Sequence, residues 1–377
     1  MRVRRHGLCG IALAVAASGA VAAESGVTLY GVADTYMQYL SNDGKNTVAL
    51  KSGGSTSSLF GLKGTEDLGG GLLAQFNVET GFNLNNGGLY ADTSKLFFRQ
   101  AWVGLKHEKY GSLSFGRQYD SSFRVVYPTD PFKVNEGLSP FAAYVLAVDR
   151  NTLSTQYDSA RLSNSVLYQT PRIGGVQLYT MYGFSETVTQ PVPSTFGNTL
   201  NLGVNFTGGG LYAGLAYVYQ HSGTARYASL PASIDLMNTE HFIAALAYRI
   251  GPVNLQANYS YNRPKGEPAP GSFTARLGSA HSLSIAEIGA TIQATAVDEI
   301  QLAALYRNVR GAHDNTPGFQ IGMDHWISKR TSLYARAGYF KNNGTATVSW
   351  PGVSVPPPVN ESGSKQAMGA VGMTHRF

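Results

Sequence analysis

The sequence predicts an all-β fold, a sixteen-stranded antiparallel barrel that crosses a membrane, with short turns at one end and long loops at the other. Three observations predict it: a leader that exports the chain, a composition suited to lipid-facing strands, and two-faced segments that recur to the last residue. Charged residues make up only 14% of the chain, which holds 44 glycines, 22 tyrosines and 17 phenylalanines. This composition suits strands that face lipid on one side and water on the other.

The N-terminus has the layout of a cleaved secretory signal over residues 1–23. Three arginines stand within the first five residues, an apolar run follows from Leu8 to Ala17, and small residues lead to Ala23. The apolar run is shorter than the roughly 20 residues that a membrane helix needs. The mature chain is therefore expected to cover residues 24–377 as a single barrel domain.

Composition argues against several classes of function. Cys9 is the single cysteine and lies in the leader, so the mature chain offers no disulfide, thiolate nucleophile or cysteine metal site. Without the leader, 26 basic residues stand against 23 acidic ones, a balance too small to indicate nucleic-acid binding. Eight histidines are scattered without metal-ligand spacing, so neither a metal nor a cofactor is expected.

Strict alternation identifies the strands. In VNLQANYSYN (253–262), apolar and aromatic residues alternate with Asn, Gln and Ser without a slip. Successive side chains of a strand point to opposite faces, so this strand separates two environments. The same pattern occurs in LNLGVNFT (200–207), HFIAALAYRI (241–250), TSLYARAGYF (331–340) and the terminal GAVGMTHRF (369–377). A soluble sandwich would also alternate, but it would leave the asymmetry of the connections unexplained.

The connections alternate between short and long. Short turns are expected at 67–71, 107–111, 171–175, 207–210, 250–252, 296–299 and 328–330. Long loops are expected near 41–57, 83–94, 120–150, 185–198, 221–238, 263–280, 311–317 and 342–364. Fifteen connections imply sixteen strands, and outer-membrane barrels have this asymmetry of tight periplasmic turns and longer extracellular loops. The apolar faces are therefore assigned to lipid and the polar faces to a watery lumen.

Several stretches, in order across the mature chain, resemble the general trimeric porins of Gram-negative β-proteobacteria. They are VTLYGVADTY (27–36), GLKGTEDLGGGLLAQFNVETGFNL (61–84), FFRQAWVGL (97–105), SLSFGRQYD (112–120), SNSVLYQTP (163–171), SKRTSLYA (328–335) and the terminal THRF. The resemblance implies a homotrimer in outer-membrane lipid that lets small hydrophilic solutes and ions diffuse through. A substrate-specific channel and an outer-membrane hydrolase are the alternatives. The hydrolase is disfavoured because no nucleophile, base and orienting group are seen to converge.

The third long loop, about 120–150, is the expected constriction. It contains the apolar stretch FAAYVLAV (141–148), which is long for a bare surface loop, and loops of this length are usually functional. In the family this loop folds into the barrel, and DPF (130–132) resembles it. The alternative is an exposed loop packed on the rim of the barrel.

Charged side chains facing one another across such a loop set the selectivity of a pore. Strand parity places five basic residues on polar faces: Lys63, Arg161, Arg249, Arg307 and Arg336. Four acidic residues belong to the loop: Asp120, Asp130, Glu136 and Asp149. The alternative for each is a solvated charge at the rim. The wall cations predict a mild anion preference, which the loop acids moderate.

Three residues depart from the simple pattern. Arg99 and Arg117 match arginines of the family, yet parity groups them with apolar neighbours, so either a bulge re-aims them or their strands face a neighbouring subunit. The family often has an arginine where this chain has Leu59, which parity places on the Lys63 face. A missing lumen cation would weaken anion preference.

The terminal Phe377 matches an aromatic residue that serves the family as an assembly signal.

Overall fold

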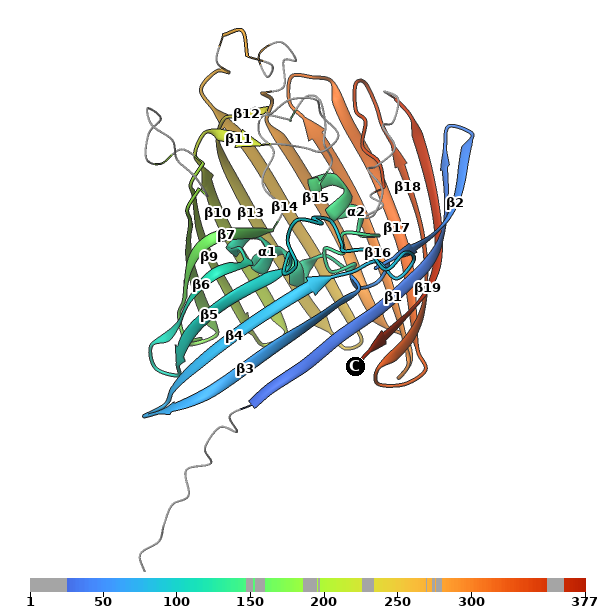
Figure 1. Ribbon diagram of the computed structural model, residues 1–377. Coiled ribbons are helices and arrows are strands. Elements are labelled where there is room, and N and C mark those ends of the chain that lie inside the picture. Colours follow the sequence, from blue (N-terminus) through green and yellow to red (C-terminus); the bar gives the residue numbers. More distant parts are fainter. Residues whose placement is uncertain are drawn as a thin grey trace, which may run out of the picture.

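The computed structural model describes residues 26–146, 160–185, 197–225, 234–268, 280–350 and 363–377, together with residues 152, 195, 270–272 and 275. Within this part of the chain, seventeen strands form one antiparallel sheet that closes on itself (Figure 1). The strands are β1 (Gly26–Asn42), β2 (Lys45–Ser52), β3 (Leu59–Gly69), β4 (Leu72–Gly81), β5 (Gln100–His107), β6 (Gly111–Tyr119), β7 (Arg161–Gln169), β8 (Val176–Gly183), β9 (Thr199–Gly208), β10 (Leu211–Gln220), β13 (Asn238–Ile250), β14 (Val253–Lys265), β15 (Leu283–Gln293), β16 (Asp298–Val309), β17 (Asp314–Trp326), β18 (Thr331–Lys341) and β19 (Lys365–Arg376).

The seventeen strands occupy sixteen positions around the barrel, because β2 and β3 share one. β1 pairs with β2 along its second half and with β3 along its first half. Residues 53–58 leave the wall between these two pairings. A separate hairpin, β11 (Gly223–Ala225) and β12 (Ile234–Leu236), lies in a long loop. The predicted sixteen-stranded barrel is therefore confirmed.

The seven short turns all fall between paired neighbours at one end of the barrel, and the long loops gather at the other end (Figure 1). Several predicted loop boundaries are wrong. β2 lies inside the expected loop 41–57, and the expected loop at 83–94 continues to residue 99 because β5 begins at Gln100. The expected long loop at 311–317 is only four residues, because β17 pairs with β16 from Asp314 onward. The expected loop at 120–150 continues to residue 160, because β7 begins only at Arg161.

The alternation predicted for VNLQANYSYN separates the two faces as expected. Gln256 and Asn258 are buried inside the barrel, whereas Leu255 and Tyr259 are 48% and 47% exposed on its outer surface. An apolar outer surface of this kind would be unfavourable in water, since it offers a continuous hydrophobic band. The inner face is polar and is covered by loops that enter the lumen.

The barrel closes where the first strand meets the last. β1 pairs with β19 over eleven residues, from Val32 opposite Arg376 to Asn42 opposite Gln366. Beyond this ladder, Gly31 and Phe377 exchange both backbone hydrogen bonds, at 3.1 and 3.0 Å. A Cβ atom at Gly31 would lie 2.3 Å from the ring of Phe377 and 2.8 Å from the Leu59 carbonyl oxygen, so a larger residue would displace the ring and press on the backbone of β3. The terminal residue therefore extends the closing seam.

Deleting Phe377 should reduce the amount of folded, surface-located barrel, because two seam hydrogen bonds and the ring above Gly31 are lost and the edge of β1 is left open. Phe377→Tyr keeps the ring and the backbone and is the matched control. Heat-modifiable gel migration of membrane extracts measures the folded fraction. Equal folded fractions in the deletion and the wild type would refute the assignment.

Candidate functional site

Loop 3, which connects β6 to β7, lies inside the barrel (Figure 1). It carries α1 (Ser121–Val126), the short η1 (Tyr127–Thr129) and α2 (Pro140–Leu146). α1 packs against β9 and β10, and α2 packs against β15, β16 and β17, so the loop crosses from one side of the lumen to the other. Within the described part of the chain, no helix is long and apolar enough to cross a membrane.

Asp120 starts this inward path. Its carboxylate accepts hydrogen bonds from the amide of Phe123 at 2.8 Å and from the hydroxyl of Ser122 at 2.7 Å, which caps α1. The side chain is fully buried, and burial raises the pKa of Asp120 to about 6. Asp120 therefore organises the loop and does not face the water path as a free charge.

Asp130 holds the tip of the loop. Its two carboxylate oxygens accept from the amides of Phe132 and Val134, at 2.8 and 2.7 Å, and from the hydroxyl of Ser139 at 2.6 Å. Within this turn, Lys133 has a φ of 58° and Val134 a φ of 50°. A β-branched residue such as valine rarely adopts a positive φ. The carboxylate bonds compensate for this strain.

The strained turn presents a positive charge to the lumen. Lys133 is exposed, and its ammonium group lies 6.0 Å from the centroid of the Tyr127 ring. Asp130 is fully buried, and burial raises the pKa of its carboxyl group. Of the two charged residues at the tip, the exposed one is therefore the cation.

A balanced cluster of two arginines and two glutamates lies under the loop. Arg99 pairs with Glu79 at 2.6 Å and Arg161 pairs with Glu136 at 2.6 Å, and both arginines donate to the Tyr119 hydroxyl. Burial opposes ionisation of Glu136, yet the guanidinium groups of Arg161 and Arg99 lower the pKa of its carboxyl to about 2. The group is therefore ionised at neutral pH, and the cluster carries no net charge.

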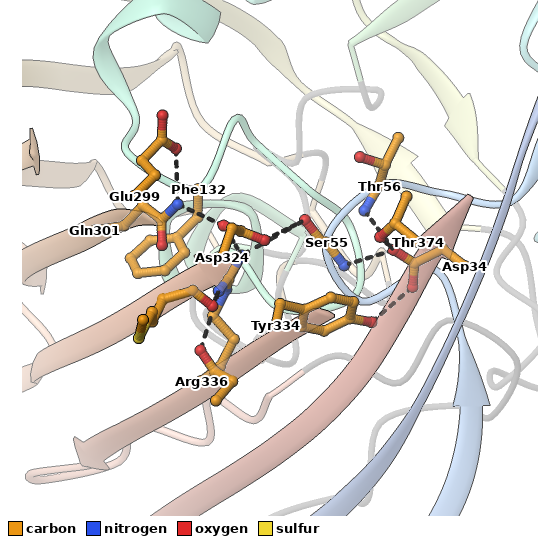
Figure 2. A network of polar contacts seen from close by, with 12 residues as sticks. Asp34, Ser55, Thr56, Phe132, Glu299, Gln301, Asp324, Tyr334, Arg336 and Thr374 are labelled. Atoms are coloured by element: carbon orange, nitrogen blue, oxygen red, sulfur yellow. Dashed lines mark hydrogen bonds and ion pairs between the residues drawn. The ribbon is translucent and has the colours of Figure 1, made fainter. Parts of the chain in front are cut away.

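A second ionic cluster joins the opposite wall to the loop tip (Figure 2). Arg336 of β18 donates to Asp324 of β17 at 2.7 Å, and its guanidinium lies 5.6 Å from the ring centroid of Phe132. Gln301 of β16 also donates to Asp324. The wall charge predicted at Arg336 is thus paired with a carboxylate that sequence reasoning did not assign to the site.

Residues 53–58, which leave the wall between β2 and β3, are held by Asp34 (Figure 2). This buried carboxylate accepts from the amides of Gly54, Ser55 and Thr56, at 2.7, 3.1 and 3.1 Å. It also accepts from the hydroxyls of Tyr334 and Thr374. Because Asn135 of loop 3 donates to the Gly53 carbonyl at 3.1 Å, this segment and the loop tip form one structure.

Loop 8, which connects β18 to β19, also enters the lumen with its described residues 342–350. Ala346, Val348 and Trp350 are at most 1% exposed. The Trp350 indole stacks on Phe340 with a centroid separation of 4.0 Å and an interplanar angle of 11°, and Phe340 in turn packs on Tyr144 of α2. Loops 3 and 8 therefore share one apolar core inside the barrel, and the alternation pattern gave no signal of it.

The remaining predicted wall residues are spread along the barrel. Arg307 pairs with Asp314 at 3.0 Å, and both side chains are fully buried. Lys63 lies on the lumen face near the short-turn end, with its ammonium group 5.2 Å from the Tyr30 ring centroid. Arg249 is exposed beside the turn between β13 and β14, which agrees with the rim alternative. Asp149 lies outside the described residues.

Irregular pairing accounts for the two arginines with unexpected parity. The amide of Arg99 donates to the Glu79 carbonyl, although the register pairs Glu79 with Gln100, so two consecutive residues face one. This bulge turns Arg99 inward. The register between β6 and β7 shifts beside Arg117, whose side chain donates to Ser163 at 2.9 Å and packs on the Phe98 ring.

Leu59 lies on the lumen face, as parity predicted, because it shares that face with Lys63 in β3. It is only 7% exposed, so the residue is covered and does not border open water.

Three further cations were missed from the sequence: Arg124 and Lys133 of loop 3, and Arg376 of β19. Arg376 donates to the Thr56 hydroxyl at 3.3 Å and lies 5.0 Å from the Trp326 ring centroid. Its alternation with the inward-facing Thr374 could have revealed it. Nothing periodic in loop 3 marks Arg124 or Lys133. Among the described residues, no cluster of three or more His, Cys, Asp or Glu side chains could hold a metal ion.

A closed barrel with a polar lumen, apolar outer strands and an inward loop lined with charge is a membrane channel of the porin class. Residues 10–345 match the Gram-negative porin family, and the chain belongs to that family. It is a porin of the outer membrane.

Relatives and solved structures agree with this assignment. Outer membrane porin protein 32 of Delftia acidovorans is 29% identical, with 97% of this chain and 99% of that protein covered. An outer membrane porin of Bordetella pertussis is 28% identical, with 89% and 94% covered. A solved structure described as an anion-selective porin from Comamonas acidovorans superposes with a TM-score of 0.77 at 24% identity, covering 94% of this chain and all of that one.

Trp350→Ala should raise single-channel conductance, because the stacked indole holds the described part of loop 8 inside the lumen. Removing a buried tryptophan costs about 3–5 kcal/mol, enough to release a short segment. Trp350→Phe keeps an aromatic ring on Phe340 and should conduct like the wild type. Planar-bilayer recording measures both variants. Unchanged conductance in the alanine variant would mean that residues 345–350 do not bound the water path.

Proposed function

We propose that this porin passes small hydrophilic solutes and ions by passive diffusion and that it prefers anions. The observation that supports the preference is the difference in exposure between the charges of loop 3. Lys133 is exposed, whereas Asp120 and Asp130 are fully buried and bonded within the loop. A cation that faces the constriction attracts anions and repels cations over the screening length of about 8 Å at physiological salt.

The paired wall charges strengthen this reasoning. Each arginine of the two ionic clusters has a carboxylate partner, so the clusters add little net field. The proposed pore lining keeps six of the predicted residues and adds three cations, with the paired charges separated from the others. The paired set is Arg99, Arg161, Arg307, Arg336 and Glu136, and the set that acts on passing ions is Lys63, Arg124, Lys133 and Arg376. The loop acids therefore moderate the anion preference less than their number implies.

One relative carries the same property in its description, since the solved porin from Comamonas acidovorans is described as anion-selective. At 24% identity this likeness extends to the fold, and the charge arrangement of this chain supports the preference independently.

A substrate-specific channel is the second candidate, favoured by a row of aromatic rings from the end of β6 into loop 3. Tyr119 stacks on Phe123 at 4.3 Å between ring centroids, and Phe123 lies 5.4 Å from Tyr127. Tyr127 is 43% exposed. Such a row could bind the apolar faces of sugar rings. A general pore conducts without saturation, whereas a specific one is blocked in a saturable way by its solute.

Lys133→Glu should shift the reversal potential under a salt gradient toward cations, because it replaces the exposed cation of the loop tip with an anion. Lys109→Glu is the matched control: it makes the same charge change in the turn between β5 and β6, at the end of the barrel. Planar-bilayer recording of the wild type and both variants measures the shift. A cation-selective wild type, or equal shifts in the two variants, would refute the charge assignment.

We further propose that the protein assembles as a homotrimer after removal of residues 1–23. The outer faces of β3 to β6 carry exposed apolar side chains, among them Phe60, Val103 and Phe115, and one solved structure with TM-score 0.63 is described as a trimer form. Unheated detergent extract should migrate as a trimer that heat converts to monomer, with a subunit mass that lacks the leader. A monomer under the mildest extraction would contradict the assembly.

A further inference from the structure

Two lysines face each other on the outer surface of the barrel at its long-loop end. Lys341, the last residue of β18, is directly opposite Lys365, the first residue of β19. Phe340 and Gln366 beside them are fully buried inside the barrel, so both lysines point outward, and both are exposed. They stand on the membrane side of the wall and not in the lumen.

The pairing geometry brings these two charges close together. The amide of Asn342 donates to the Ser364 carbonyl at 2.9 Å, which makes that next pair the hydrogen-bonded one. Lys341 and Lys365 therefore form a non-hydrogen-bonded pair, in which opposite Cα atoms are about 4.5 Å apart and side chains are closest. Like charges placed directly opposite each other destabilise a sheet.

Within the described part of the chain, neither lysine of this pair forms an ion pair with a carboxylate. Asp43, in the turn that follows the adjacent β1, is a neighbouring acid, and its Oδ1 accepts a hydrogen bond from the backbone amide of Lys365 at 3.1 Å. An exposed, uncompensated pair of this kind fits an anionic partner from outside the chain.

The surroundings place the pair at the level of lipid headgroups. Tyr339, two residues before Lys341, lies 6.0 Å from Phe319 between ring centroids, and Phe319 is 54% exposed on the outer face. Aromatic side chains gather at the membrane interface of such barrels. On the loop side, the Asn343 amide donates to the Asn315 side chain at 2.8 Å, which adds polar groups above the lysines.

We propose that this surface, defined by Tyr339, Lys341, Asn343 and Lys365, binds the phosphate groups of a phosphorylated glycolipid of the outer leaflet. The two ammonium groups contact phosphate as point charges, which removes their mutual repulsion. The aromatic ring contacts the top of the acyl region, and the amide contacts sugar hydroxyls. The inference rests on the outer-membrane location of this porin and is independent of its ion preference.

The test uses the full-length exported protein in phosphatidylcholine nanodiscs that contain a small fraction of bisphosphorylated lipid A, with EDTA present to remove divalent bridges. Native mass spectrometry measures lipid A retained per subunit. The double variant Lys341→Gln/Lys365→Gln should lose about tenfold or more in affinity. Lys341→Arg/Lys365→Arg should retain it, and Lys329→Gln/Arg330→Gln, at the opposite end of the barrel, should bind like the wild type.

Further outcomes decide between occupants. Lipid A without phosphates should bind weakly to the wild type and to every variant. If the wild type binds phosphorylated and dephosphorylated lipid A equally well, the proposal is overturned. Undiminished retention in the glutamine variant would overturn it as well. If that variant loses the trimer in lipid-free detergent, the lysines belong to the subunit interface and the proposal fails. If the two lysines bind lipid, the lipid-free glutamine variant should unfold at the same temperature as the wild type or at a higher one, because the repulsion between the two ammonium groups is removed.

Discussion

Closure of the sheet is the constraint on which the rest of this structure depends. In lipid, a backbone group without a partner costs several kcal/mol, so the first and last strands must pair along their full membrane depth. The seam between β1 and β19 does this, and the exchange of hydrogen bonds between Gly31 and Phe377 extends it to the final residue. Glycine at position 31 leaves room for the terminal ring and for the Leu59 carbonyl of β3, which a Cβ atom would approach to 2.8 Å.

The same seam also organises the lumen. Asp34 lies on β1, and its carboxylate gathers the backbone of residues 54–56 from one side and Thr374 of β19 from the other. Tyr334 of β18 adds a further bond. A buried carboxylate is stable only when its oxygens are well satisfied, and here five donors do so. The segment it holds then receives Asn135 of loop 3, so closure of the barrel and placement of the constriction are physically linked.

Inside the barrel, most charge is neutralised locally and the apolar parts of two loops pack together. Arg161 with Glu136 and Arg336 with Asp324 are buried pairs that fix the shape of the wall. Trp350, Phe340 and Tyr144 form a dry contact between loop 8 and loop 3. Under the proposed function, the field that a passing ion experiences comes from the cations outside these pairs, and the exposed Lys133 at the loop tip contributes most directly.

The alternation of Gln256 and Asn258 with Leu255 and Tyr259 was enough to predict strands, their facing and the barrel, because a side-chain period of two is a local property of extended backbone. It also placed Arg161, Arg307 and Arg336 on the inner wall. It failed at Arg99, because a bulge depends on how two strands meet and leaves no trace in the periodicity of either one.

By itself the sequence determined which residues face lipid and how many strands cross the membrane, whereas the inward course of the longest loop was expected mainly from the resemblance to the family. Only the tertiary structure decided which charges act on solutes. Asp130 and Lys133 are three residues apart, and from the sequence each contributes one charge of opposite sign. In the structure, the carboxylate is buried and accepts hydrogen bonds from three donors within the turn, whereas the lysine side chain is exposed. Pairing and burial are properties of neighbours brought together from distant parts of the chain, and for that reason the sequence could not assign them.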